Sequence, residues 1–191
     1  MDKLKDYVQI TPSIPKKLCK KIVTELKNSQ WEEHQFINYS GTRDIDADIK
    51  IQKSPCQNLS KNVELKHDKK LMNVLHEVIS NYIKTLKTPH FETWNGYTYI
   101  KYNKYSVGNS MEKHIDHIHS IFDGTTKGIP ILSIIGLLDD KFQGGEIEMF
   151  KDTKIKLKVG EVLIFPSNFQ YPHMVCPITK GTRHSFVSWV Y

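Results

Sequence analysis

Hydrophobic residues recur along this chain with two different periods, and the period changes near residue 89. Residues 68–87 carry an apolar side chain at every third or fourth position, which predicts an amphipathic helix with Asp68 as its N-cap. Residues 13–29 repeat that spacing over a shorter stretch and predict a second helix, capped by Ser13. We therefore expect the first third of the chain to be helix and loop.

The segment between these helices is polar. Residues 40–62 contain few apolar side chains, so they predict a long loop with at most one short strand. Long loops in compact domains often act as lids or binding loops, so this segment is the natural place for substrate specificity. Whether it is also a lid over the substrate is left open by the sequence. It contains Arg43, for which a surface position is the favoured interpretation.

After residue 89 the helical period gives way to short runs of β-branched and aromatic residues separated by turn signals. About eight such runs in roughly 100 residues predict a sandwich, a jelly roll or a barrel. The stretch DDKFQGGEIE predicts the turn of one hairpin, and KLKVGEV predicts a second tight turn. The expected architecture is α+β but mainly β, in one domain over 1–191: a helical support with a loop over 1–88, and a β-core over 89–191.

Composition narrows the class of protein. Hydrophobic content is 39% and charged content 25%, which is typical of a soluble globular protein. The first fifteen residues lack the apolar region of a secretory signal, and no apolar run is long enough to cross a membrane. The three cysteines, Cys19, Cys56 and Cys176, match neither a disulfide framework nor a zinc motif. These features favour a cytoplasmic, intracellular location.

The net charge is +6, and all but two of the 27 basic residues are lysine. Such a surplus can attract acidic partners, including nucleic acid. The lysines are spread along the chain, however, which favours a solvated surface. Because lysine fills nearly every basic position, a site that retains arginine, such as Arg183, is expected to need the planar guanidinium.

Potential metal ligands cluster in MEKHIDHIHSIF, residues 111–122. If this stretch is a strand, alternation places His114 and Asp116 on one face and His117 and His119 on the other. One imidazole and one carboxylate can hold a metal from one side, but a third ligand must come from elsewhere. His117 and His119 are then either surface residues or residues of an active-site rim that contacts substrate.

The candidate for the third ligand is His173, which follows the apolar run VLIFP and begins another strand. Two histidines and one carboxylate form the facial triad of non-haem Fe(II) oxygenases, which leaves positions for a co-substrate and dioxygen. Ten residues further on, Arg183 could pair bidentately with the far carboxylate of a dicarboxylate co-substrate. The remaining histidines are interpreted as surface or packing residues: His34, His67, His76, His90 and His184.

This ordered set resembles the 2-oxoglutarate/Fe(II)-dependent dioxygenases, in particular their prolyl 4-hydroxylase-like branch. YSVGNSMEKHID resembles the stretch that leads into the branch's His-x-Asp. ILSIIGLLDDKFQGGEIEMF resembles its two central strands, and LKVGEVLIFPSNFQYPHMVCPITKGTRHSFVSWV resembles its C-terminal block. The resemblance covers residues 90–191 strongly and the N-terminal third weakly. It implies a double-stranded β-helix, or jelly-roll, core.

The resemblance also implies roles for individual residues. His114, Asp116 and His173 match the Fe(II) ligands, and Arg183 matches the residue that pairs with the distal carboxylate of 2-oxoglutarate.

Three further positions match less firmly. The tyrosine that hydrogen-bonds the same carboxylate corresponds to Tyr105, with Tyr102 as the alternative in a tyrosine-rich strand. Trp189 matches an aromatic residue that lines the pocket, although a core position is an equal alternative. Ser133 matches a small hydroxyl residue of the central strand, for which packing is the favoured role.

The implied function is hydroxylation of an unactivated C–H bond, most simply in a peptidyl residue such as proline. Fe(II) is the implied metal, 2-oxoglutarate is consumed to succinate and CO₂, and ascorbate is expected as a reductant. Asp116 favours hydroxylation, because halogenating relatives have a small residue there. One alternative is a free amino acid or small metabolite as substrate, and another is a non-catalytic β-domain that binds metal or carbohydrate. Dealkylation of nucleic acid is disfavoured, since Trp189 stands where that branch has a second arginine.

Overall fold

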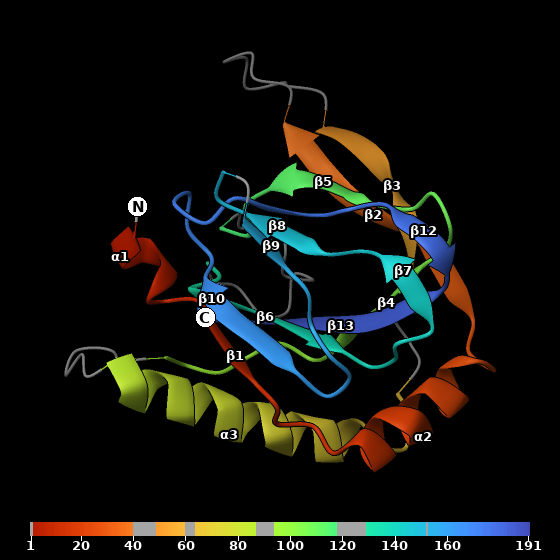
Figure 1. The fold of residues 1–191 in the computed structure, drawn as a ribbon, viewed down its shortest axis with the longest axis horizontal. Coiled ribbons are helices and arrows are strands. Elements are labelled where there is room, and N and C mark those ends of the chain that lie inside the picture. The colour runs from red at the N-terminus through yellow and green to blue at the C-terminus, as the bar shows by residue number, and fades with distance from the viewer. Residues whose placement is uncertain (1, 40–48, 60–63, 87–93, 118–128, 152) are drawn as a thin grey trace.

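The computed structural model describes residues 2–39, 49–59, 64–86, 94–117, 129–151 and 153–191. Antiparallel strands dominate this part of the chain, and two longer helices lie along one side (Figure 1). No helix among the described residues has the length and apolar character needed to cross a membrane.

The larger sheet has seven strands in the order β1-β10-β6-β13-β4-β3-β2. All of its pairings are antiparallel. Its strands are β1 (Gln9–Thr11), β2 (Trp31–Tyr39), β3 (Ile49–Leu59), β4 (Lys101–Tyr105), β6 (Leu132–Leu137), β10 (Val162–Pro166) and β13 (Arg183–Val190).

A smaller sheet lies over this one, with four strands in the order β5-β11-β8-β9. Its strands are β5 (Met111–His114), β8 (Ile147–Met149), β9 (Thr153–Ile155) and β11 (His173–Val175). A two-stranded ribbon of β7 (Phe142–Gly144) and β12 (Ile178–Gly181) completes the described β-structure. Two facing antiparallel sheets joined in this way form the double-stranded β-helix, or jelly roll, that the sequence predicts.

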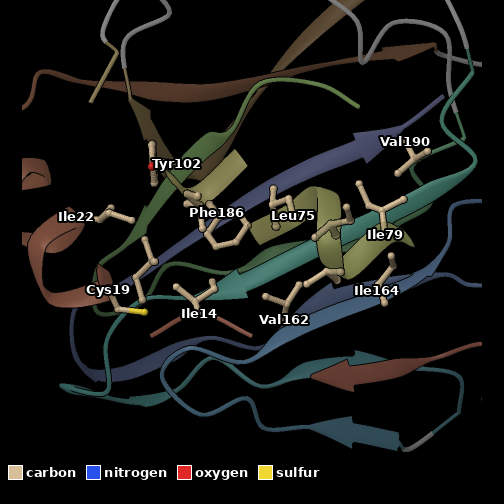
Figure 2. Close-up of a cluster of buried hydrophobic side chains, with 14 of the residues drawn as sticks. Ile14, Cys19, Ile22, Leu75, Ile79, Tyr102, Val162, Ile164, Phe186 and Val190 are labelled. Atoms are coloured by element: carbon tan, nitrogen blue, oxygen red, sulfur yellow. The ribbon is translucent and has the colours of Figure 1, made fainter. Parts of the chain in front are cut away.

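One hydrophobic cluster joins the helices to the outer face of the larger sheet (Figure 2). Helix α2 (Lys16–Leu26) contributes Ile22, and helix α3 (Asp68–Leu86) contributes Leu75 and Ile79. The sheet contributes Phe186 of β13 and Ile164 of β10, both fully buried. The short helix α1 (Asp2–Lys5) precedes β1.

A second cluster fills the space between the two sheets. Ile135 and Leu163 belong to the larger sheet and alternate with residues that face the helices, because successive side chains of a strand point to opposite faces. Ile147 and Met149 come from the smaller sheet. The central strand β6 of the larger sheet is therefore buried on both faces, which explains its continuous apolar run LSIIGL.

The N-terminal third contains more β-structure than expected. Residues 31–39 and 49–59 pair as strands β2 and β3, so much of the predicted polar loop is a long strand. The sequence predicts a loop here because the residues of β3 are mostly polar and show no clear apolar alternation. Residues 40–48 and 60–62 of the predicted loop lie outside the described residues, as does Arg43.

Two cap and turn predictions also need correction. Ser13 does not cap α2: the residue before the helix is Pro15, and no described side chain caps it. The Ser13 hydroxyl pairs with that of Thr11 at 2.6 Å. DDKFQGGEIE does not close a hairpin, because β6 pairs with β10 and β13 and β8 lies in the other sheet.

The second predicted turn is present. In KLKVGEV the N–H of Glu161 donates to the carbonyl of Lys158 at 3.0 Å, and Gly160 has a φ of 86°. A Cβ at Gly160 would come within 2.3 Å of the Ile14 carbonyl oxygen, so glycine is required at this point for steric reasons as well.

Candidate metal centre and co-substrate site

The three predicted metal ligands meet in the structure. His114 is the last residue of β5, and its register partner on β11 is His173. Asp116 follows two residues later in a bend. The prediction that one strand carries both His114 and Asp116 is therefore wrong, because β5 ends at His114. The bend still returns the carboxylate to the two imidazoles, and one ligand atom from each residue lies within 4.8 Å of the others.

The carboxylate of Asp116 lies between the two histidines. Its Oδ1 is 3.4 Å from Nε2 of His114, and its Oδ2 is 3.8 Å from Nε2 of His173. The two imidazole centroids are 4.4 Å apart. His173 and Asp116 are buried, and His114 is partly exposed. The cluster therefore opens to solvent on the His114 side.

Hydrogen bonds at the other ring nitrogens leave both Nε2 atoms directed at the cluster. Nδ1 of His114 lies 2.7 Å from the carbonyl oxygen of Glu112, and Nδ1 of His173 lies 3.2 Å from that of Tyr171. A carbonyl can only accept, so each Nδ1 carries a proton, and in the neutral form of each imidazole Nε2 has a lone pair for a metal. Outer hydrogen bonds of this kind are the usual support of histidine ligands.

The electrostatics of the cluster favour deprotonated Asp116. Burial alone would raise the pKa of its carboxyl group. The neighbouring His173 and His114 and a hydrogen bond from Ser133 outweigh burial and hold that pKa well below its usual range. Burial lowers the pKa of His173, which favours its neutral form. An ionised carboxylate beside a neutral imidazole is the form in which both groups bind a cation.

Two side chains of the larger sheet donate hydrogen bonds to Asp116. The Ser133 hydroxyl is 2.7 Å from Oδ2, and Nε1 of Trp189 is 3.0 Å from the same oxygen. Ser133 and Trp189 are register partners on β6 and β13, so their side chains lie on the same face. Trp189 thus reaches the triad directly, and Ser133 has a polar contact in addition to packing.

The same face of β13 carries Arg183 at its other end. The guanidinium is 2% exposed, and its Nη1 donates to the Ser185 hydroxyl at 2.7 Å. Tyr105 is the register partner of Arg183, and the centre of the guanidinium lies 5.2 Å from the centroid of its ring. This buried cation on a rigid strand suits a carboxylate ligand.

Tyr102 is not brought to this site. It lies three residues from Tyr105 on β4, and its hydroxyl donates to Oδ1 of Asp68 at 2.6 Å, at the start of α3. Its ring belongs to the cluster between the helices and the sheet (Figure 2). Arg183, the register partner of Tyr105, lies on the opposite face of the sheet.

None of the other described histidines belongs to the triad. His184 faces away from Arg183 along β13, and its Nδ1 pairs with the carboxylate of Asp139. His117 directly follows Asp116 and is exposed. This fits both predictions for it, a surface residue and a residue of the active-site rim. His119 lies outside the described residues.

Three polar residues of the inward face were missed by sequence reasoning. Ser185 orients Arg183, and Ser167 pairs with Ser133 at 2.8 Å. Asn103 is 4% exposed beside Ser185 in the register, and its Oδ1 accepts no hydrogen bond from the described part of the chain. Ser185 could have been predicted, because it lies two residues after Arg183 and therefore on the same face of the strand. No local sequence pattern indicates Ser167 or Asn103.

Comparison with known proteins agrees with this geometry. The family model described as "2OG-Fe(II) oxygenase superfamily" matches residues 100–191, which include the triad, Arg183 and Trp189. A PKHD-type hydroxylase of Prochlorococcus marinus is 27% identical over 176 residues, covering 82% of this chain and 76% of that protein. One of Idiomarina loihiensis is 31% identical over 94 residues, covering 48% of this chain and 41% of its own length. This chain thus spans well under two thirds of some of its curated relatives.

Solved structures share the fold at low sequence identity. A viral collagen prolyl hydroxylase of Paramecium bursaria Chlorella virus-1 is 15% identical, with a TM-score of 0.64 and coverage of 96% of this chain and 94% of that one. A Trichoplax adhaerens prolyl hydroxylase in complex with a hypoxia inducible factor peptide fragment is also 15% identical. Its TM-score is 0.67, with coverage of 97% and 83%. At this identity the likeness shows the jelly-roll fold, which is the fold described above.

Proposed function

Since the chain belongs to the 2-oxoglutarate/Fe(II)-dependent oxygenases, in their prolyl 4-hydroxylase-like branch, we propose that it hydroxylates an unactivated C–H bond of a peptidyl residue, with proline as the first candidate. The observation that carries the proposal is the convergence of His114, Asp116 and His173, each of which offers one ligand atom within 4.8 Å of the other two. The similar proteins are named as a PKHD-type hydroxylase and a collagen prolyl hydroxylase, and these names support the choice of substrate class.

The residues present fit Fe(II). Two neutral imidazoles and one carboxylate are the ligand set of a non-haem Fe(II) site with open positions. When bound, Fe(II) with 2-oxoglutarate and dioxygen supplies the oxidation: the co-substrate loses CO₂ and takes one oxygen atom to become succinate, and the other oxygen becomes the hydroxyl group of the product.

The chain's own part is to bind, orient and exclude water. Arg183 would hold the distal carboxylate of 2-oxoglutarate, with Ser185 fixing the guanidinium and Tyr105 beneath it. Phe165 is fully buried and packs edge-on against the ring of His173, with centroids 4.9 Å apart. This contact fixes the imidazole and keeps water from its inner side.

Two alternatives to this proposal are a different substrate and a domain that binds metal without turnover. A free amino acid or small metabolite would use the same triad and Arg183. A non-catalytic metal-binding domain would retain the triad without turnover. The use of ascorbate as reductant stays a prediction that the same assay can address.

The test is an anaerobic-to-aerobic assay of the purified chain with Fe(II) and 2-oxoglutarate. We expect succinate to form after oxygen is admitted, faster with proline-containing peptides than with free proline, and the peptide to gain 16 Da. The matched control is His173→Ala, which should abolish succinate formation. Stimulation by free amino acids or metabolites alone would select the first alternative. The oxygenase proposal would be abandoned if no succinate formed under any condition.

A further inference from the structure

The carboxylate of Asp116 is held by a chain of buried hydroxyl groups that the proposed reaction does not use. Ser133 lies on β6 and Ser167 directly after β10, and each is 1% exposed. Their hydroxyl oxygens are 2.8 Å apart, and that of Ser133 is 2.7 Å from Oδ2 of Asp116. These three groups therefore form one continuous path into the metal centre.

The direction of the hydrogen bonds along this path is fixed by proton count. An ionised carboxylate can only accept, so Ser133 must donate its single proton to Oδ2. Having no second proton, Ser133 can only accept from Ser167, which must therefore be the donor of that pair. Trp189 donates the other bond to Oδ2, since an indole nitrogen can only donate.

We propose that Ser167 and Ser133 form an ordered hydroxyl relay that, together with Trp189, holds the carboxylate of Asp116 in the orientation in which it would bind the metal. Ser133 and Ser167 are positioning residues in this scheme, because they act on the metal through Asp116. The proposal rests on the proposed metal site and adds the residues that hold its carboxylate in place.

Two hydrogen bonds fix the orientation of the Asp116 carboxylate between the histidines. Oδ2 receives these bonds at 2.7 and 3.0 Å. Oδ1 lies 3.4 Å from Nε2 of His114, and Oδ2 lies 3.8 Å from Nε2 of His173. Residues that orient a ligating carboxylate in this way typically change metal affinity by 10- to 100-fold when removed. Within a hydrogen-bond chain, the outer member strengthens the inner bond by polarising it, so its own effect is smaller.

The experiment is an anaerobic Fe(II) titration, with saturating 2-oxoglutarate, followed by the visible charge-transfer absorption of the complex. Ser133→Ala should weaken Fe(II) binding by at least about tenfold, and Ser167→Ala by about two- to threefold. Ser167→Ala should have no further effect in the Ser133→Ala background, because the relay is already broken. Ser188→Ala is the matched control: it is a fully buried serine that bonds to Thr98 on the opposite face of β13.

The outcomes separate this inference from the proposed function. A wild-type protein that binds no Fe(II) would overturn both. A wild-type protein that binds Fe(II), with Ser133→Ala at the same affinity or no weaker than Ser188→Ala, would overturn the relay alone. The relay is also excluded if Ser167→Ala has its full effect in the Ser133→Ala background. Near-ultraviolet circular dichroism of each variant checks that the core is intact.

Discussion

At the scale of single residues, Tyr102 and Tyr105 provide a matched pair on one strand. Tyr105 lies beside Arg183, and Tyr102 bonds to Asp68 under the helices. We expect Tyr105→Phe to raise the KM for 2-oxoglutarate severalfold with little change in stability. Tyr102→Phe should leave that KM unchanged and lower the free energy of unfolding by about 1–3 kcal/mol, because the half-buried carboxylate of Asp68 loses its donor.

Urea denaturation and the succinate assay measure the two effects independently. An increase in KM for Tyr102→Phe with none for Tyr105→Phe would reverse the assignment, despite the register that pairs Tyr105 with Arg183.

Arg183 provides the second prediction at this scale. Its Nη1 donates to Ser185, and a planar guanidinium can pair with a carboxylate through two N–H groups at once. Arg183→Lys keeps the charge but loses the fork, so we expect the Kd for 2-oxoglutarate to rise about 10-fold or more. Isothermal titration in the presence of Mn(II) gives that constant without turnover. An unchanged Kd would show that charge alone suffices and that Ser185 does not orient a bidentate group.

The sequence predicted the residues that carry distinctive chemistry and missed those that support them. His114, Asp116 and His173 could be selected because few side chain types bind metal, and their order has a recognisable spacing. Ser167 and Asn103 belong to common residue types, and their importance depends on strand register across the sheet. Register is a tertiary property that a single sequence does not display.

At the scale of elements, β6 and β13 meet at a point where no side chain other than hydrogen fits. Gly136 is the register partner of Phe186, and a Cβ at Gly136 would lie 2.1 Å from two ring atoms of Phe186. We expect Gly136→Ala to destabilise the protein by about 1–3 kcal/mol through overpacking, measured by urea denaturation.

A second variant tests the cause. Leucine at position 186 removes the ring atoms that collide, so Gly136→Ala combined with Phe186→Leu should cost less than the sum of the two single changes. Strictly additive losses would show that the collision is relieved elsewhere, for example by a shift of β6 along its partner.

Elements were predictable where periodicity was strong. Helix α3 was predictable because its apolar face repeats over five turns, and β13 matches its alternating pattern. Asp68 is the first residue of α3 and not its N-cap, because its Oδ2 accepts from the N–H of Leu65. The hairpin of β2 and β3 was missed because its mostly polar sequence carries little periodic signal. The sequence predicts a turn at β7 because its partner strand, β12, lies more than thirty residues further along the chain.

At the scale of the whole molecule, the larger sheet is the structure that the two hydrophobic clusters share. Its outer face packs against α2 and α3, and its inner face packs against the smaller sheet and carries Arg183, Ser133 and Trp189. Displacing the helices would expose the back of the strands that hold the site. We therefore propose that the helices and the jelly roll unfold together as one domain.

Cys19 tests this proposal, because it lies on α2 at the interface with the sheet and is fully buried (Figure 2). Burial raises the pKa of its thiol to about 11, against a reference value of 9.0. In the unfolded chain the thiol ionises first, so the contribution of Cys19 to the free energy of unfolding should fall as pH rises from about 9 to 11, by at most about 1.4 kcal/mol per pH unit. Cys19→Ala should reduce the slope measured by urea denaturation by that amount. The part due to Tyr82 and Tyr102, whose pKa values burial raises from 10.0, should stay.

Alkylation by iodoacetamide at pH 8, read by peptide mass spectrometry, then measures how Cys19 becomes accessible. If the two layers unfold together, the free energy of exposing Cys19 equals the global free energy of unfolding and falls in parallel with it as urea is added. A markedly smaller value with weak urea dependence would mean that α2 separates from the sheet locally. The helices would then be a detachable cover of the jelly roll, and its metal centre would not depend on them for stability.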